Sequence, residues 1–173
     1  MSNTIMLQPL IFYYSKTGTT ARIAEIVLPT IKAESRKIVE PGDWRDKLKI
    51  RRYSHAEEEV KKANAAIVEF DPIILLTAVS KGKPPSSMIE FLEQIDLRGK
   101  RVILGLVGTE GTNPKAVDKL RSKVVERGSR FVTTIYLRGV ITGPDWIDLG
   151  EEDFTREAAN LAELVFTLSE VPR

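Results

Sequence analysis

The residues from Ser15 to Thr20 form a concentrated set of hydrogen-bonding groups. They read Ser-Lys-Thr-Gly-Thr-Thr, so four hydroxyl side chains and one glycine stand within six positions. The segment follows a short apolar run, Leu10 to Tyr14, and precedes a helical pattern. The N–H groups and the dipole at a helix N-terminus favour an anion, and a phosphate suits this set of donors. The sequence therefore predicts a phosphate-binding turn.

Three other interpretations of this turn account for it less well. A helix cap needs one hydroxyl, whereas this turn offers four. The Gly-Lys-Ser/Thr ending of a triphosphate P-loop is absent, and so is the G-x-G-x-x-G pattern of a dinucleotide loop. The pattern favours a phosphate-bearing ligand of another kind.

The elements that must position this turn alternate between strand and helix patterns. Short apolar runs rich in branched or aromatic residues indicate strands, and a weaker one indicates an edge strand. Continuous apolar runs are typical of a parallel sheet that helices cover on both faces. The expected strands are Leu10 to Tyr14, Arg36 to Val39, Ile73 to Val79, Val102 to Val107 and Phe131 to Leu137.

Helical spacing and end signals predict the helices between these strands. Pro29 is expected to kink the first helix or end it early. Ser87 and Glu90 have capping-box spacing, and Gly128 is a stop signal. Four expected helices are marked by apolar residues at helical spacing: Ile23, Ile26, Val27 and Ile31; Met88, Phe91, Leu92 and Ile95; Val117, Leu120 and Val124, after Asn113 and Pro114; and Ala158, Leu161, Ala162 and Val165, beginning near Asp153 or Thr155. A further short helix is expected over His55 to Ala63, after an insertion over about 41–53.

Composition restricts the class of protein. The 173 residues, 42% of them hydrophobic and 29% charged, predict one folded domain over 1–173. No cysteine and one histidine exclude disulfides, thiolate nucleophiles and multi-histidine metal sites. A net charge of +2 gives no indication of nucleic-acid binding. No apolar run is long enough for a membrane span, so a cytoplasmic protein is expected.

Three segments resemble the flavodoxin family. Residues 11–27 are similar to its signature: apolar and aromatic residues, Ser-x-Thr-Gly-x-Thr, then Ala and aliphatic residues. Residues 71–93 are similar to its third strand and the loop that follows, with Gly82-Lys83-Pro84-Pro85 and Phe91-Leu92 in matching places. Residues 97–102 and then Gly108 to Gly111 resemble its fourth strand and ring-side loop. The resemblance extends from Leu10 to about Leu137.

The resemblance implies a flavodoxin-like three-layer doubly wound α/β fold, with a five-stranded parallel sheet of order 2-1-3-4-5. It also implies non-covalently bound flavin mononucleotide (FMN), with no metal and no catalytic side chain. The phosphate would be held by Ser15, Lys16, Thr17, Gly18, Thr19 and Thr20. The flavin ring would lie between Thr77, Ala78, Val79, Ser80, Lys81 and Gly82 on one side and Gly108, Thr109, Glu110, Gly111 and Thr112 on the other.

The sequence departs from the family pattern in two ways. The two ring-side loops contain no Trp or Tyr, which predicts weaker flavin binding and a more open ring face. Carrier flavodoxins are usually acidic, whereas this chain is slightly basic. Two roles in electron transfer stay open: a carrier between proteins, or an NAD(P)H-dependent reductase of a small acceptor such as a quinone. The alternative is a non-enzymatic binding or scaffold domain that has lost the flavin.

Overall fold

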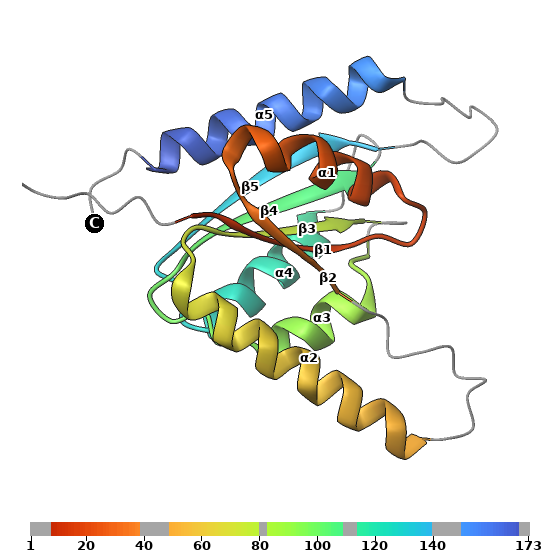
Figure 1. Ribbon diagram of the computed structural model, residues 1–173, viewed down its shortest axis with the longest axis vertical. Coiled ribbons are helices and arrows are strands. Elements are labelled where there is room, and N and C mark those ends of the chain that lie inside the picture. The colour runs from red at the N-terminus through yellow and green to blue at the C-terminus, as the bar shows by residue number, and fades with distance from the viewer. Residues whose placement is uncertain (1–7, 39–48, 80–82, 109–113, 140–149, 170–173) are drawn as a thin grey trace, which may run out of the picture.

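A computed structural model describes residues 8–38, 49–79, 83–108, 114–139 and 150–169. Five strands alternate with five helices along the chain (Figure 1). The strands are β1 Leu10–Tyr14, β2 Glu34–Lys37, β3 Ile73–Ala78, β4 Arg101–Gly108 and β5 Phe131–Arg138. The helices are α1 Thr19–Ile31, α2 Lys49–Glu69, α3 Ser86–Gln94, α4 Pro114–Glu126 and α5 Glu151–Ser169. All five expected strands are therefore present.

The strands form one parallel sheet in the order β2-β1-β3-β4-β5, which confirms the predicted fold and strand order. Helices α1 and α5 cover one face, and α2, α3 and α4 cover the other (Figure 1). In register across the sheet, Leu10 of β1 lies beside Ile73, which lies beside Val102 of β4. This register brings the carboxyl ends of β1, β3 and β4 to one edge.

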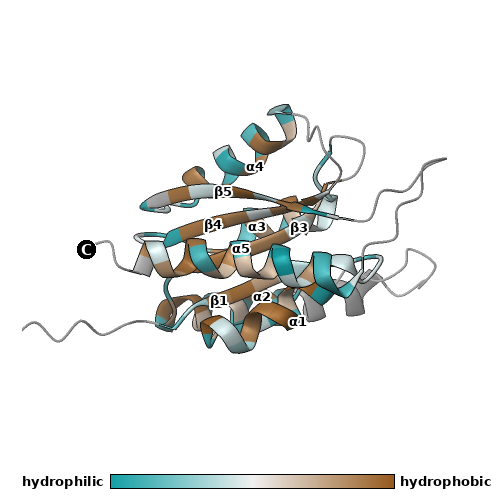
Figure 2. Ribbon diagram, turned by 90° about the horizontal axis from the view of Figure 1, so that it is seen from above, coloured by the Kyte–Doolittle hydropathy of each residue, from teal (hydrophilic) through white to brown (hydrophobic). Residues whose placement is uncertain are grey.

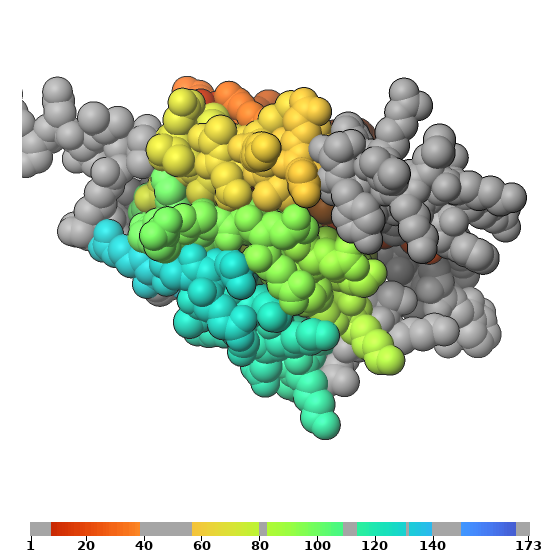
Figure 3. Space-filling view, turned by 90° about the horizontal axis from the view of Figure 1, so that it is seen from below, coloured from red at the N-terminus to blue at the C-terminus, as the bar shows by residue number. Residues whose placement is uncertain are grey.

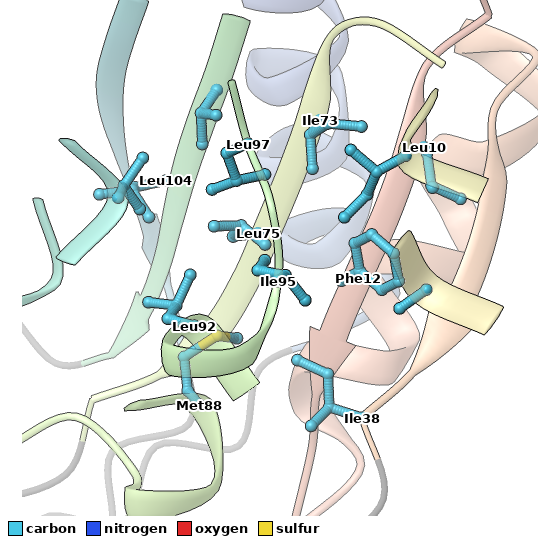
Figure 4. Packing of buried hydrophobic residues seen from close by; sticks show 14 of the residues in the cluster. Leu10, Phe12, Ile38, Ile73, Leu75, Met88, Leu92, Ile95, Leu97 and Leu104 are labelled. Atoms are coloured by element: carbon cyan, nitrogen blue, oxygen red, sulfur yellow. The ribbon is translucent and has the colours of Figure 1, made fainter. Parts of the chain in front are cut away.

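The core consists of two hydrophobic clusters, one on each face of the sheet. Successive side chains of a strand point to opposite faces, so Phe12 and Leu75 face α2 and α3, whereas Ile11 and Ile74 face α1 and α5. Figure 4 shows the first cluster, in which α3 contributes Met88 and Leu92 and the loop after it contributes Ile95 and Leu97. Hydrophobic residues predominate in the strands, and hydrophobic and hydrophilic residues alternate along the helices (Figure 2). Burial on both faces explains the continuous apolar runs.

A glycine in the middle of β4 allows close packing across the sheet. A Cβ atom added at Gly105 would collide with the Cδ2 atom of Leu76 and contact Leu137 at 3.7 Å. Leu76 is fully buried on the face that α1 and α5 cover. The leucine therefore occupies the volume that a side chain at position 105 would need.

The helices differ from the sequence expectations at three ends. Helix α1 continues past Pro29 to Ile31, because a proline in the last turn removes only one hydrogen bond near the end of the ladder. Helix α2 has 21 residues and extends well beyond the expected 55–63, so the insertion is partly helical. The capping-box prediction is wrong: α3 begins at Ser86, and the carbonyl of Pro85 accepts hydrogen bonds from Met88 and Ile89.

The amino-terminal edge of the sheet is held by two buried or half-buried cations. The Asp71 carboxylate accepts hydrogen bonds at 3.1 Å from the backbone N–H and from Nε of Arg101, whose guanidinium also donates to the carbonyl of Leu168 at the end of α5. Nζ of Lys100 donates to the carbonyls of Val68 and Phe70, 2.9 Å from each. These bonds join β4 to the ends of α2 and α5. Among the described helices, none is both long and apolar enough to cross a membrane.

Candidate phosphate-binding site at the carboxyl edge

The turn between β1 and α1 lies at the carboxyl edge of the sheet. At this point of the sheet, successive strands are added on opposite sides of β1. From β1 the chain first adds β2 on one side and then β3 on the other. Ligands of open α/β sheets bind in the crevice that such a reversal leaves outside the carboxyl ends of the strands. The predicted turn therefore lies where this topology favours a ligand.

The start of α1 has no side-chain cap. Its N-cap residue is Gly18, which adopts a left-handed conformation with φ of 94° and ψ of −20°. The carbonyl of Gly18 accepts the first helical bond from Arg22 N–H at 2.9 Å. The first N–H groups of an α-helix, here those of Thr19, Thr20 and Ala21, have no partner within the helix. This leaves several donors at the turn for an anion.

The turn itself is closed by one of its own hydroxyls. Oγ of Ser15 accepts a hydrogen bond from the N–H of Gly18, with the two atoms 3.1 Å apart. Lys16, Thr17 and Gly18 are exposed, Ser15 and Thr19 are half-buried, and Thr20 is only 1% exposed. The accessible hydroxyls are therefore those of Thr17, Thr19 and, in part, Ser15, while that of Thr20 is buried.

The ends of the neighbouring strands lie next to this turn. Tyr14 pairs with Thr77, so the last residues of β3 adjoin the end of β1. Thr77 is fully buried, and its hydroxyl lies 3.3 Å from the carbonyl of Ala78. The N–H of Val79 donates to the carbonyl of Val107 at 3.0 Å, which extends the pairing of β3 with β4.

The predicted ring-side loops are described only where they leave the strands. Ala78 and Val79 are half-buried at the end of β3, and Gly108 ends β4. The carbonyl of Gly108 accepts a 3.0 Å hydrogen bond from the N–H of Gly139, beyond the end of β5. The remaining predicted residues, Ser80, Lys81, Gly82, Thr109, Glu110, Gly111 and Thr112, lie outside the described residues.

An ion pair that no sequence pattern predicts joins the starts of α1 and α5. Arg22 donates to both carboxylate oxygens of Glu151, from Nε at 3.2 Å and from the terminal nitrogen at 2.8 Å. These hydrogen bonds lower the pKa of the Glu151 carboxyl below its ordinary value and raise the pKa of Arg22. Arg22 also contacts Glu25 at 3.4 Å. The arginine next to the turn is therefore engaged by carboxylates.

The described residues contain no group of three His, Asp or Glu side chains placed to hold a metal ion. The site's described donors are backbone N–H groups, hydroxyls and the ammonium of Lys16. A set of this kind suits a phosphate oxygen.

No protein-family model and no curated protein sequence matches the chain. Solved structures do match it. Oxidised flavodoxin 2 from Bacillus cereus superposes with a TM-score of 0.61 at 22% identity, over 93% of this chain and 99% of that one. The protein has the flavodoxin-like fold.

Two oxidoreductases share this flavodoxin-like fold. The apo form of the NADH:FMN oxidoreductase EMOB gives a TM-score of 0.61 at 19% identity, over 95% of this chain and 92% of that one. The NAD(P)H:quinone oxidoreductase from Methanothermobacter marburgensis gives 0.61 at 13% identity, over 96% and 99%. The flavodoxin and the two oxidoreductases thus superpose on this chain with the same TM-score, 0.61.

Proposed function

We propose that this protein binds FMN and transfers electrons through it. The observation that carries the proposal is the uncapped start of α1 at Gly18, at the carboxyl end of a central strand. The named flavodoxin and NADH:FMN oxidoreductase with the same fold support it. The proposal predicts that the phosphate of FMN binds in the turn from Ser15 to Thr20.

The turn offers enough hydrogen bonds to hold a phosphate dianion without an arginine. A hydrogen bond to a charged oxygen contributes about 1.5–3 kcal/mol. The hydroxyls of Ser15, Thr17 and Thr19 and the N–H groups at the start of α1 would supply them, and Lys16 would add a positive charge. Residues 77–82 and 108–112 would border the ring. The flavin, when bound, supplies the redox chemistry, and the chain holds and orients it.

The proposed role is that of an electron carrier or of an NAD(P)H-dependent reductase of a small acceptor such as a quinone. The reductase role is supported by the two oxidoreductases that share the fold. Turnover of NADH or NADPH with a benzoquinone by the FMN-loaded protein would assign it as a reductase. Absence of turnover would leave the carrier role.

Binding of FMN is tested by its spectrum and by titration. We expect FMN to bind near one per chain and at least tenfold more tightly than riboflavin, which lacks the phosphate. Thr17→Asp places a negative charge in the exposed turn and should bring the two affinities close together. Thr30→Asp is the matched control, because Thr30 is exposed near the other end of α1. A colourless protein that takes up no FMN would overturn the proposal.

A further inference from the structure

Strand β5 forms one long outer strand of the sheet. Among the described residues, β4 pairs with it on one side and no strand pairs with it on the other. It has eight residues, and its one charged residue, Arg138, is the last. The strand at the opposite side, β2, has four residues, and Glu34, Arg36 and Lys37 among them are charged. A short, charged outer strand prevents pairing with another chain, whereas a long one with few charges favours it.

The backbone groups of β5 that point away from the sheet follow from one hydrogen bond. The N–H of Gly139 donates to the carbonyl of Gly108 in β4, and backbone groups alternate in direction along a strand. Ile135, four positions before Gly139, therefore directs its N–H and C=O groups to β4. Thr134 and Tyr136 direct theirs outward, where another strand can pair with them.

Exposed apolar side chains border this outer strand. Tyr136 of β5 is 58% exposed, and Val125 of α4 is 55% exposed. Nζ of Lys123 in α4 lies 3.2 Å from the carboxylate of Glu93 in α3, so that side of α4 faces α3. Val125 lies about 200° further around the helix and therefore faces away from α3, on the side of β5. On the other face of the sheet, Ile135 is half-buried.

The side of the molecule that ends in β5 is large enough for a stable interface. Eight residues that rise about 3.3 Å each make β5 about 26 Å long. The sheet and the helix layers on its two faces are each about 10 Å thick, which gives about 30 Å across. The product is about 800 Å², the area that each partner contributes to an interface of standard size.

We propose that a second copy of this chain docks here through its own β5, antiparallel to the first around a two-fold axis. The pair joins two five-stranded sheets into one. With Ile135 at the axis, Thr134 lies opposite Tyr136 of the second copy, and Thr133 lies opposite Leu137. No two like charges therefore face each other within the paired strands. A two-fold pair is closed, so it ends at two chains.

Charges on α4 complement one another in the same arrangement. Asp118 and Arg121 are both exposed, and they lie on the side of α4 that carries Val125. Around a two-fold axis the two copies of α4 run antiparallel, so Arg121 of each copy comes beside Asp118 of the other. This order of charges favours a second copy of the chain as the partner.

Sedimentation of the purified full chain tests the proposal. We expect the mass to increase from 19.4 kDa to twice that value between about 1 and about 200 µM, and no further. Tyr136→Lys places a charge on the outer strand and should raise the Kd of the dimer at least tenfold. Val68→Lys is the matched control and should change the Kd less than twofold. Val68 is 74% exposed at the end of α2, and Figure 3 shows α2 on the far side of α3 from α4.

Hydrogen exchange followed by NMR identifies the paired strand. The amide of Thr134 should exchange at least tenfold more slowly in the natural protein than in Tyr136→Lys. The amide of Ile135, which pairs with β4, should exchange alike in both proteins. A general loss of stability in the variant would instead accelerate both amides.

A charge exchange on α4 tests the orientation of the two copies. Asp118→Arg should raise the Kd of the dimer at least fivefold, because it places like charges together. Adding Arg121→Asp to the same chain should return the Kd to within twofold of the natural value. A double variant that stays as weak as Asp118→Arg overturns the antiparallel arrangement.

Three results of sedimentation overturn the docking proposal. They are the mass of one chain at every concentration, a mass that increases beyond two chains, and equal effects of Tyr136→Lys and Val68→Lys. None of these measurements involves flavin, so this inference and the proposed function can fail separately.

Discussion

The ion pair between Asp71 and Arg101 is expected to be a main support of the amino-terminal edge. Only 11% of the Asp71 side chain and 12% of the Arg101 side chain are exposed, and their charged atoms lie 3.1 Å apart. Arg101→Met leaves the carboxylate with the single N–H of residue 101, and Asp71→Asn leaves the guanidinium with the carbonyl of Leu168. Removing one partner of a buried pair costs about 3–5 kcal/mol, because the other charge stays buried.

Urea unfolding followed by circular dichroism measures this cost. For a chain of this size, a loss of 3–5 kcal/mol corresponds to a decrease in Tm of about 6–20 °C. The double variant should lose much less than the sum of the two single losses, because no unpaired charge remains. FMN affinity should not change, since the pair lies at the edge opposite the proposed site. Single losses below about 1 kcal/mol, or additive losses, would refute this reasoning.

Two further predictions concern packing and pH. Gly105→Ala should lower the free energy of unfolding by about 1–3 kcal/mol through overpacking, and Leu76→Val in the same chain should restore part of it, as urea unfolding would show. The carboxyl of Glu151 should titrate below the ordinary glutamate pKa in an NMR titration, and Arg22→Gln should return it to the ordinary value. Because the folded pKa is the lower one, the ion pair stabilises the fold above the ordinary glutamate pKa, and this contribution is lost as the pH falls through the folded pKa. An unchanged pKa in Arg22→Gln would contradict this assignment.

The sheet could be predicted from the sequence because its strands have strong local signals. Runs such as Leu10 to Tyr14 and Ile73 to Val79 are apolar without interruption, since both faces of each strand are buried. The turn from Ser15 to Thr20 could be located for the same reason, because its residues are adjacent in the chain, and its binding of a phosphate stays a prediction. Strand β2 gave a weak signal, because at the sheet edge Glu34, Ser35 and Lys37 are exposed.

Other features could not be predicted, because their partners are distant in the sequence or their geometry overrides a local pattern. Arg22 and Glu151 lie 129 positions apart, and no spacing rule relates them. The start of α3 is set by the carbonyl of Pro85, which overrides the capping-box spacing of Ser87.

The amino-terminal edge of the sheet holds buried stabilising contacts, whereas the carboxyl edge holds the proposed ligand site. Asp71, Arg101 and Lys100 tie the strands to the ends of α2 and α5 on the side away from the proposed ligand. Among the described residues, the carboxyl edge holds the ion pair of Arg22 with Glu151, whose side chains are 44% and 69% exposed, and an exposed pair stabilises a fold less than a buried one. Loops grafted there from other proteins of this architecture should be accepted by the same scaffold, which makes the edge a suitable place to engineer new ligand preferences.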